Sequence, residues 1–263
     1  MFGYQGMIAV AEALSRAFAS GAELALRSGE APQSQDEAEA LRDAAARGAG
    51  PIKAWKLGAT IPAVRRDLGL SRQFFGPLPA SLVFEDGAEL DGFHTRLRGV
   101  ESEYGFELAR DVAPGDAELG PDAFVRLFAG VRPTIEIPGT RFASLGQYGG
   151  FGLVADFGAA GGLVLGPARR LETFAHLDAA SVRLSFAGRQ VACGSAEAIE
   201  GGAAGPLRVF LRQALEAGYK LQAGQTIVTG SCTGYLKAPP GERVEAAFDA
   251  LGASVSVTFR NPS

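Results

Sequence analysis

The chain has 263 residues, of which 47% are hydrophobic and 21% are charged. This balance is typical of a globular protein and excludes a largely disordered chain. The net charge is -4 and Lys and Arg do not cluster, so we expect no nucleic-acid partner. No apolar run is long enough to cross a bilayer, and the amphipathic N-terminus does not read as a signal peptide. We therefore expect a cytoplasmic protein with no membrane partner.

The first fifty residues are predicted to form a helical N-terminal segment, residues 1–50. An Ala- and Leu-rich pattern predicts one helix over residues 6–20, and a second helix follows Ser34. Ser34 is expected to cap the second helix, with Glu37 three residues later as its capping-box partner.

The remaining residues, 51–263, are predicted to form a β-rich catalytic domain. Short apolar runs ended by Gly or Pro predict strands, with hairpin turns at residues 187–188 and near 251–252. Two helices are predicted between the strands, one beginning at Pro121 and one closed by Gly218. The predicted fold class is α+β, with a β-rich body behind a helical N-terminal segment.

Residues 99–108, "GVESEYGFEL", contain a carboxylate at alternate positions. In a strand, successive side chains point to opposite faces, so Glu101, Glu103 and Glu107 share one face. Three like charges on one face repel each other unless water or a cation relieves them. This face is therefore either solvated, as in many antiparallel sheets, or part of a metal site.

A further carboxylate, Glu136, lies between two isoleucines in "PTIEIPG". A buried carboxylate is costly unless a cation or a hydrogen-bond donor compensates it. An edge strand, which Pro138 permits, would instead leave it exposed. Together with Glu101 and Glu103, Glu136 makes a candidate set of three oxygen ligands for a hard cation such as Mg²⁺.

Six short motifs carry a family resemblance. In chain order they are "WKLGAT", "VESE", "TIEIPGTRF", "ADFGAAGGLVLG", "LQAGQTIVTGSCTG" and "LGASVSVTF". The series resembles the 2-keto-4-pentenoate hydratase / 4-oxalocrotonate decarboxylase group of the fumarylacetoacetate hydrolase superfamily. The resemblance implies a fumarylacetoacetate-hydrolase-like mixed β-roll. It also implies a Mg²⁺ or Mn²⁺ ion held by Glu101, Glu103 and Glu136.

The resemblance implies a metal-dependent lyase, a hydratase or decarboxylase acting on a small 2-oxo or 2-hydroxydienoic acid through a metal-stabilised enolate. Lys56 matches the family's lysine and is expected to be catalytic, neutralising charge or moving protons. The alternative for Lys56 is a surface lysine. Asp156, Gly162, Ser231 and Thr233 are expected to contact the substrate, with a turn as the alternative role of the last two. A homo-oligomer and a role in the catabolism of aromatic compounds are implied as well.

The chain departs from the family pattern at several positions. Phe74 or Phe75 stands where the hydratases have an Asp, Phe157 replaces an amide, and Ala159 and Ala160 replace two hydroxyls. If these residues line the pocket, it should accept a more apolar substrate. We expect weak hydration, because the water-handling groups are missing, whereas decarboxylation needs only an electron sink and charge neutralisation.

Two alternatives to a lyase are an acylpyruvase-type C–C hydrolase and a degenerate, non-catalytic binder of metal-chelated organic acids. The hydrolases use a His/Glu dyad, whereas His94 and His176 form none in the sequence and are expected to be structural. Cys193 and Cys232 are too far apart for zinc-ligand spacing, and Cys232 is expected to be a packed side chain.

Overall fold

The structure, a computed structural model, describes residues 4–260. The helices are α1 (Tyr4–Ser20), α2 (Gln35–Ala46), α3 (Pro62–Asp67), α4 (Pro121–Val125), α5 (Gly149–Ala155), α6 (Ala175–Asp178) and α7 (Gly205–Glu216). The strands are β1 (Ile52–Gly58), β2 (Phe74–Pro79), β3 (Val83–Glu85), β4 (Ala88–Leu90), β5 (Gly99–Leu108), β6 (Phe128–Pro138), β7 (Ala160–Leu165), β8 (Val182–Phe186), β9 (Arg189–Gly194), β10 (Thr226–Val228), β11 (Leu236–Lys237), β12 (Arg243–Phe248) and β13 (Ala253–Phe259).

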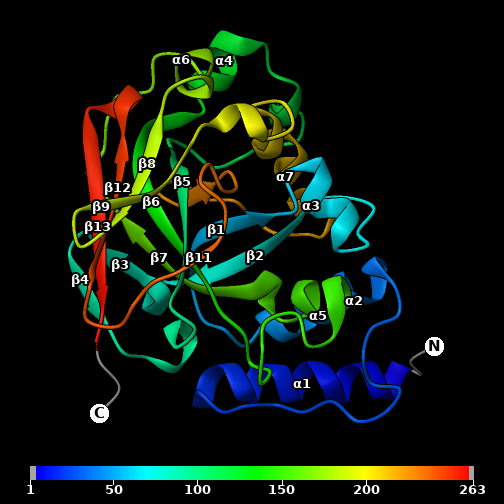
Figure 1. The fold of residues 1–263 in the computed structure, drawn as a ribbon. Helices are drawn as coiled ribbons and strands as arrows, with labels where there is room; N and C mark the ends of the chain where they lie inside the picture. Colours follow the sequence, from blue (N-terminus) through cyan, green and yellow to red (C-terminus); the bar gives the residue numbers. More distant parts are fainter. Residues whose placement is uncertain (1–3, 261–263) are drawn as a thin grey trace.

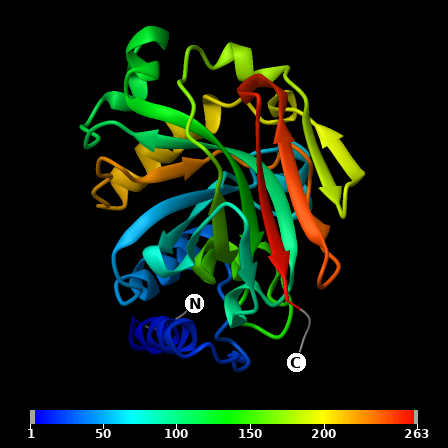
Figure 2. The same ribbon diagram turned by 90° about the vertical axis from the view of Figure 1, so that its left-hand side faces the viewer.

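The strands form two mixed sheets. The larger has the order β2-β1-β10-β5-β6-β7-β3, with β11 paired to β5, and the smaller has the order β4-β13-β12-β8-β9. The pairs β1–β10, β3–β7 and β4–β13 are parallel, and the others are antiparallel. In Figure 2, β12 and β13, in orange and red, lie in front of the larger sheet. The predicted α+β architecture is confirmed.

The N-terminal helices lie below the larger sheet in Figure 1, where α1 packs on α2 and α2 on α5. Ser34 caps α2 as predicted, because its Oγ accepts a hydrogen bond from the backbone N–H of Glu37 at 3.2 Å. The Glu37 side chain accepts from the backbone N–H of Gln33 at 2.9 Å, so the returning bond falls one residue before the expected one. The division into residues 1–50 and 51–263 stays a prediction.

Both predicted hairpins are present. Residues 187–188 join β8 to β9, and their φ angles of 47° and 77° match the left-handed turn that the twist of paired strands favours. Residues 249–252 join β12 to β13. The helix predicted from Pro121 is shorter than expected, because Phe128 already begins β6.

Two clusters of buried apolar side chains hold the fold together. One fills the space between the two sheets and α7, and contains Trp55 and Phe210. The other lies between the larger sheet and helices α1, α2 and α5, and contains Leu14 and Leu41. No helix within residues 4–260 combines the length and the hydropathy needed to span a bilayer.

Candidate metal centre and active site

Three carboxylates meet at the centre of the larger sheet. Glu101 and Glu103 lie on β5, and Glu136 on β6 stands directly across from Glu101 in the strand register. One oxygen of each carboxylate lies within 4.8 Å of the others. Because β6 is flanked by β5 and β7, the alternative of an exposed edge strand for Glu136 is wrong.

Burial separates these glutamates from the third one of the "GVESEYGFEL" stretch. Glu103 and Glu136 are only 1% and 0% exposed, so the alternative of a solvated face is wrong for this part of β5. Glu107, at the other end of the strand, is partly exposed and forms an ion pair with Arg132 at 3.0 Å. The alternating glutamates therefore divide into the partly buried Glu101 and buried Glu103, which lie beside Glu136, and Glu107, which forms an ordinary ion pair.

The hydrogen bonding of the cluster is incomplete. Glu103 accepts a bond from the backbone N–H of Gly230 at 3.0 Å, whereas both oxygens of Glu136 are buried without a hydrogen-bond partner. Buried carboxylate oxygens without a partner destabilise the folded state unless a positively charged group compensates them. Oxygens that bind one Mg²⁺ or Ca²⁺ ion lie up to about 4–5 Å apart. The donor chemistry and the spacing therefore fit a hard divalent cation.

Lys56 extends from β1 toward the same cluster. It is 4% exposed, and its Nζ lies 3.5 Å from Oε1 of Glu136. The alternative of a surface lysine is therefore wrong. The Phe74 ring closes the other side, with its centroid 5.6 Å from Nζ.

The charges of the cluster shift one another's pKa values. Burial lowers the pKa of Lys56, but the carboxylates of Glu136, Glu101 and Glu103 outweigh burial and leave that pKa above its usual value. Burial raises the pKa of Glu103 to about 8, and the charge of Glu101 adds to this effect. Burial also raises the pKa of Glu136 well above its ordinary range. Three carboxylates face one ammonium, so the cluster is short of positive charge.

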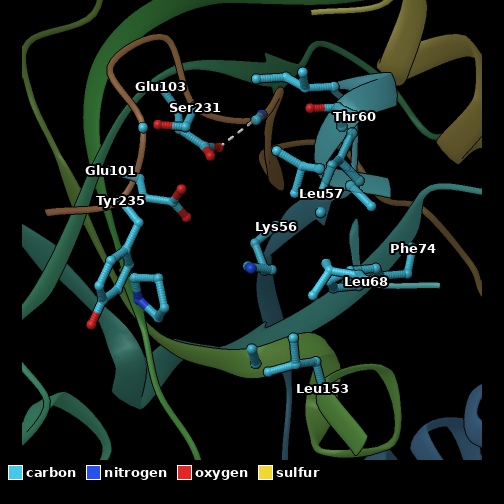
Figure 3. A pocket seen from close by; sticks show the side chains of 18 of the residues that line it. Lys56, Leu57, Thr60, Leu68, Phe74, Glu101, Glu103, Leu153, Ser231 and Tyr235 are labelled. Atoms are coloured by element: carbon cyan, nitrogen blue, oxygen red, sulfur yellow. Dashed lines mark hydrogen bonds between the residues drawn. The ribbon is translucent and has the colours of Figure 1, made fainter. Parts of the chain in front are cut away.

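A cavity of about 260 Å³ opens beside this cluster. Figure 3 shows Lys56 between the two glutamates of β5 and an apolar side that includes Leu68 and Phe74. Within the described lining, Lys56 is the single cationic side chain. The apolar side is formed by Ile61, Val64, Leu68, Phe74, Leu145 and Leu153.

The four predicted substrate contacts lie in different surroundings. Ser231 lines the cavity, and its Oγ is buried without a hydrogen-bond partner. Thr233 is not part of the lining, and its Oγ1 accepts from the backbone N–H of Ser102 at 3.3 Å. Asp156 and Gly162 do not line the cavity either. The Asp156 carboxylate is bound by Arg141 instead, so the structure does not bring this residue to the pocket.

The residues that depart from the family pattern also divide. Phe74 and Ala159 line the cavity, whereas Phe75, Phe157 and Ala160 are buried outside it. Phe75 differs from Phe74 because neighbouring side chains of a strand point to opposite faces. The Phe157 ring stacks on helix α1. Phe74 is therefore the one of the two alternatives that faces the pocket, and the interpretation that Phe157 and Ala160 also face it is wrong.

Two polar residues of the cavity lining were not predicted from the sequence. Thr60 ends the "WKLGAT" motif and is 4% exposed, and Tyr235 follows the "GSCTG" turn and is 45% exposed at the cavity mouth. Their positions, at the end of one motif and directly after another, are the sequence feature that could have indicated a place in the site. Cys232 is buried, and burial raises the pKa of its thiol, as expected of a packed side chain.

No model of a known protein family matches the chain. A 4-oxalocrotonate decarboxylase of Pseudomonas sp. is 29% identical over 202 residues, which cover 75% of each chain. A 2-keto-4-pentenoate hydratase of Paraburkholderia xenovorans (strain LB400) is 28% identical over 207 residues, or 78% of this chain and 75% of the relative. The chain is thus similar along three quarters of its length to enzymes named as hydratases and as a decarboxylase. The resemblance read from the motifs is thereby confirmed, and these relatives are enzymes.

Solved structures of the hydratase and decarboxylase group and of the wider superfamily share the fold. The 4-oxalocrotonate decarboxylase from Pseudomonas putida G7, complexed with magnesium and adipate, has a TM-score of 0.83 at 22% identity. That match covers 98% of this chain and 99% of the other. The fumarylpyruvate hydrolase from Pseudomonas aeruginosa, in complex with Mn²⁺ and pyruvate, has a TM-score of 0.56 at 16% identity and covers 81% of this chain and 91% of that one. The predicted fumarylacetoacetate-hydrolase-like fold is confirmed.

Proposed function

We propose that this protein is a divalent-metal-dependent lyase of the hydratase/decarboxylase type, acting on a small 2-oxo or 2-hydroxydienoic acid through an enolate. The observation that carries the proposal is the cluster of the partly buried Glu101 with the buried Glu103 and Glu136, in which the Glu136 oxygens have no hydrogen-bond partner and Lys56 lies 3.5 Å away. The homologous enzymes and the magnesium and manganese complexes of similar folds support it.

In this proposal Glu101, Glu103 and Glu136 hold Mg²⁺ or Mn²⁺. The ion supplies positive charge that favours the negative charge of an enolate. Lys56 places its ammonium beside the same cluster, where it neutralises charge on the acid or moves a proton. The unpartnered Oγ of Ser231 is free to donate a hydrogen bond to an oxygen of the substrate.

The apolar side of the cavity favours decarboxylation over hydration. Phe74 and Ala159 line this side with hydrocarbon. Among the described lining residues, hydroxyl groups are the only side-chain groups that could orient a water molecule on this side of the cavity. Apolar walls exclude water and strengthen the attraction between an enolate and the cationic groups beside it. A decarboxylation, or another enolate-forming step on a 2-oxo acid with an apolar tail, therefore suits this cavity better.

The test follows two reactions side by side with Mg²⁺ present. Loss of dienoate absorbance reports hydration of 2-hydroxypenta-2,4-dienoate, and release of CO₂ reports decarboxylation of 4-oxalocrotonate. We expect CO₂ release to be the faster reaction and hydration to be weak or absent. Efficient hydration without CO₂ release would overturn the preference for decarboxylation.

The cavity lining bears on the first of the two other functions, and the assay bears on the second. An acylpyruvase would cleave a C–C bond with a His/Glu dyad, but no histidine is among the described lining residues. His94 packs on Phe18 with the ring centroids 4.6 Å apart, and burial lowers its pKa to about 4. A binder without activity would bind Mg²⁺ and oxalate but turn over neither substrate. Assembly as a homo-oligomer, location in the cytoplasm and a role in aromatic catabolism stay predictions.

A further inference from the structure

Three consecutive residues with left-handed backbone join α5 to β7 beside the cavity. Phe157, Gly158 and Ala159 have φ angles of 54°, 60° and 57°. For a residue with a side chain this conformation costs about 1–2 kcal/mol, so Phe157 and Ala159 hold it only because their surroundings impose it. Ala159 lines the cavity, so this strained segment, residues 157–159, is part of its wall.

Arg141 binds both ends of the strained segment. Its Nη2 donates to the carbonyl oxygen of Asp156 and its Nη1 to that of Ala160, each at 2.6 Å, so the two bonds bracket residues 157–159. Its Nε also donates to the carboxylate of Asp156, which accepts further bonds from the Arg141 backbone N–H and from Thr140 Oγ1. Arg141 and Asp156 are 0% and 1% exposed, so this is a fully buried and fully bonded ion pair.

The strained segment is wedged against strand β2. A Cβ atom added to Gly76 would lie 2.2 Å from the carbonyl oxygen of Phe157, and one added to Gly158 would lie 2.5 Å from that of Phe75. No side chain fits between the two backbones. Phe74 of β2 and Ala159 of the segment therefore form one apolar wall, whose spacing depends on where residues 157–159 are held.

Helix α1 closes the segment from the outside. The ring of Phe18 stacks on that of Phe157 at 4.4 Å, and the Arg141 guanidinium lies 5.6 Å from the Phe18 ring. The clasp, formed by Arg141 and Asp156, is thus sealed from water, which strengthens its hydrogen bonds.

We propose that Arg141 and Asp156 are positioning residues that hold the strained segment in place and so shape the apolar wall that receives the substrate's tail. They do not touch the cavity themselves. The carboxylates of the cluster lie on β5 and β6 and receive no hydrogen bond from Arg141, so we expect the clasp to affect the tail of the substrate more than its head. The inference rests on the proposed function for the identity of the ligand, but its structural part does not.

The test uses Arg141→Lys, because lysine keeps the charge but cannot bond both ends of the segment at once. The matched control is Arg132→Lys, since Arg132 also joins a carboxylate, Glu107, to a carbonyl oxygen, that of Gly166, and does not line the cavity. In the ligand-free protein, hydrogen exchange at residues 157–160 should become about tenfold faster in Arg141→Lys and stay unchanged in the control.

Calorimetry with Mg²⁺ then compares two ligands. Oxalate contacts the metal side alone, whereas 2-oxohexanoate adds an apolar tail. In Arg141→Lys we expect oxalate affinity within about twofold of wild type and a loss of about tenfold for 2-oxohexanoate, because misplacing a wall weakens contacts with the tail. A merely structural role would lower both affinities together or neither.

If Arg141→Lys does not fold, Thr140→Val provides a milder perturbation, since it removes one donor to Asp156 and keeps the ion pair. In this variant we expect hydrogen exchange at residues 157–160 to be about threefold faster and the affinity for 2-oxohexanoate about threefold weaker than in wild type. Unchanged exchange at residues 157–160, or faster exchange with an unchanged ratio of the two affinities, would overturn the positioning role. A wild-type protein that binds neither ligand overturns the proposed function, and the exchange measurement then decides the clasp by itself.

Discussion

Two groups of buried charge lie close together along strand β6 and the loop that follows it, and they are built in opposite ways. In the clasp, one cation meets one anion, and Asp156 accepts bonds from Arg141 and Thr140. In the carboxylate cluster, three carboxyl groups share one ammonium, and neither oxygen of Glu136 has a hydrogen-bond partner.

The difference separates a structural ion pair from a binding site. A buried charge that is paired and hydrogen-bonded is tolerated, and it fixes the backbone around it. A buried cluster of carboxyl groups with too few cationic partners destabilises the folded protein. Such a cluster is typical of a binding site, where a ligand supplies the positive charge. The clasp is complete within the chain, whereas we propose that a cation completes the cluster of Glu101, Glu103 and Glu136.

The largest effect is expected from removing the anion of the clasp. Asp156→Ala leaves Arg141 buried without a counter-charge, which should lower the free energy of unfolding by about 3–5 kcal/mol. Urea denaturation measures it. Asp249→Ala is the control, because it breaks an exposed pair with Arg183 and should change stability little. Equal effects of the two variants would contradict the distinction.

Lys56→Met tests the cationic member of the cluster. With Mg²⁺ present, turnover should fall about a hundredfold or more, because a charge-neutralising or proton-moving group is lost. The melting temperature should change far less. Lys53→Met is the control on the same strand, since that lysine is exposed and bonds the Gly224 carbonyl oxygen. If Lys56→Met keeps wild-type turnover, Lys56 is not catalytic.

Metal binding should stabilise the folded protein. At a Mg²⁺ concentration a hundred times the Kd, the gain is about 2.7 kcal/mol, seen as a higher melting temperature. Glu101→Ala, Glu103→Ala and Glu136→Ala should each abolish the rise, whereas Glu107→Ala, on the same strand but in an ion pair, should keep it. A rise that persists in all three cluster variants would eliminate this metal site.

The stability of the metal-free protein should fall as the pH rises. The pKa of Glu103 is about 8 in the folded state, whereas in the unfolded chain it has the ordinary value of 4.5. Between these values the folded state binds more protons, so its stability should fall as the pH rises. Melting curves in EDTA measure this trend. Added Mg²⁺ should reverse it, since it binds the ionised carboxylates; parallel curves with and without the ion would contradict the prediction.

The smallest effect should come from Glu136→Gln. This change removes a buried charge while keeping the shape of the side chain, so the metal-free protein should gain about 1 kcal/mol in stability. The same variant should lose its response to Mg²⁺. Destabilisation in EDTA would instead show that Glu136 is a needed partner of Lys56, as Asp156 is of Arg141.

The sequence predicted the local features well. The cap at Ser34, the hairpin turns at 187–188 and near 251–252, and the α+β class all follow from short-range geometry. The helix predicted from Pro121 was too long, because its apolar residues suit the start of β6 equally well. A helix and a buried strand share apolar composition, so periodicity over a few residues does not separate them.

The candidate site was predicted in part. The motifs pointed to Lys56, Ser231, Glu101 and Glu103, which line one cavity, and to Glu136, which lies beside these two glutamates. They also pointed to Asp156, whose carboxylate looks the same in sequence as one that binds substrate. Its partner Arg141 lies fifteen residues earlier, after a different strand, and no local pattern reveals that pairing.

By itself, the sequence determined that Glu101, Glu103 and Glu107 share one face, because the alternation of a strand is a property of the backbone. Only the tertiary structure decided that the first two join the buried Glu136 in one cluster while Glu107 pairs with Arg132. The surroundings of this cluster come from distant parts of the chain, because Lys56 of β1 lies beside Glu136 and the backbone N–H of Gly230 bonds Glu103. The tertiary surroundings therefore divide a regular pattern into a cluster that we propose to be a cation site and a glutamate in an ordinary ion pair.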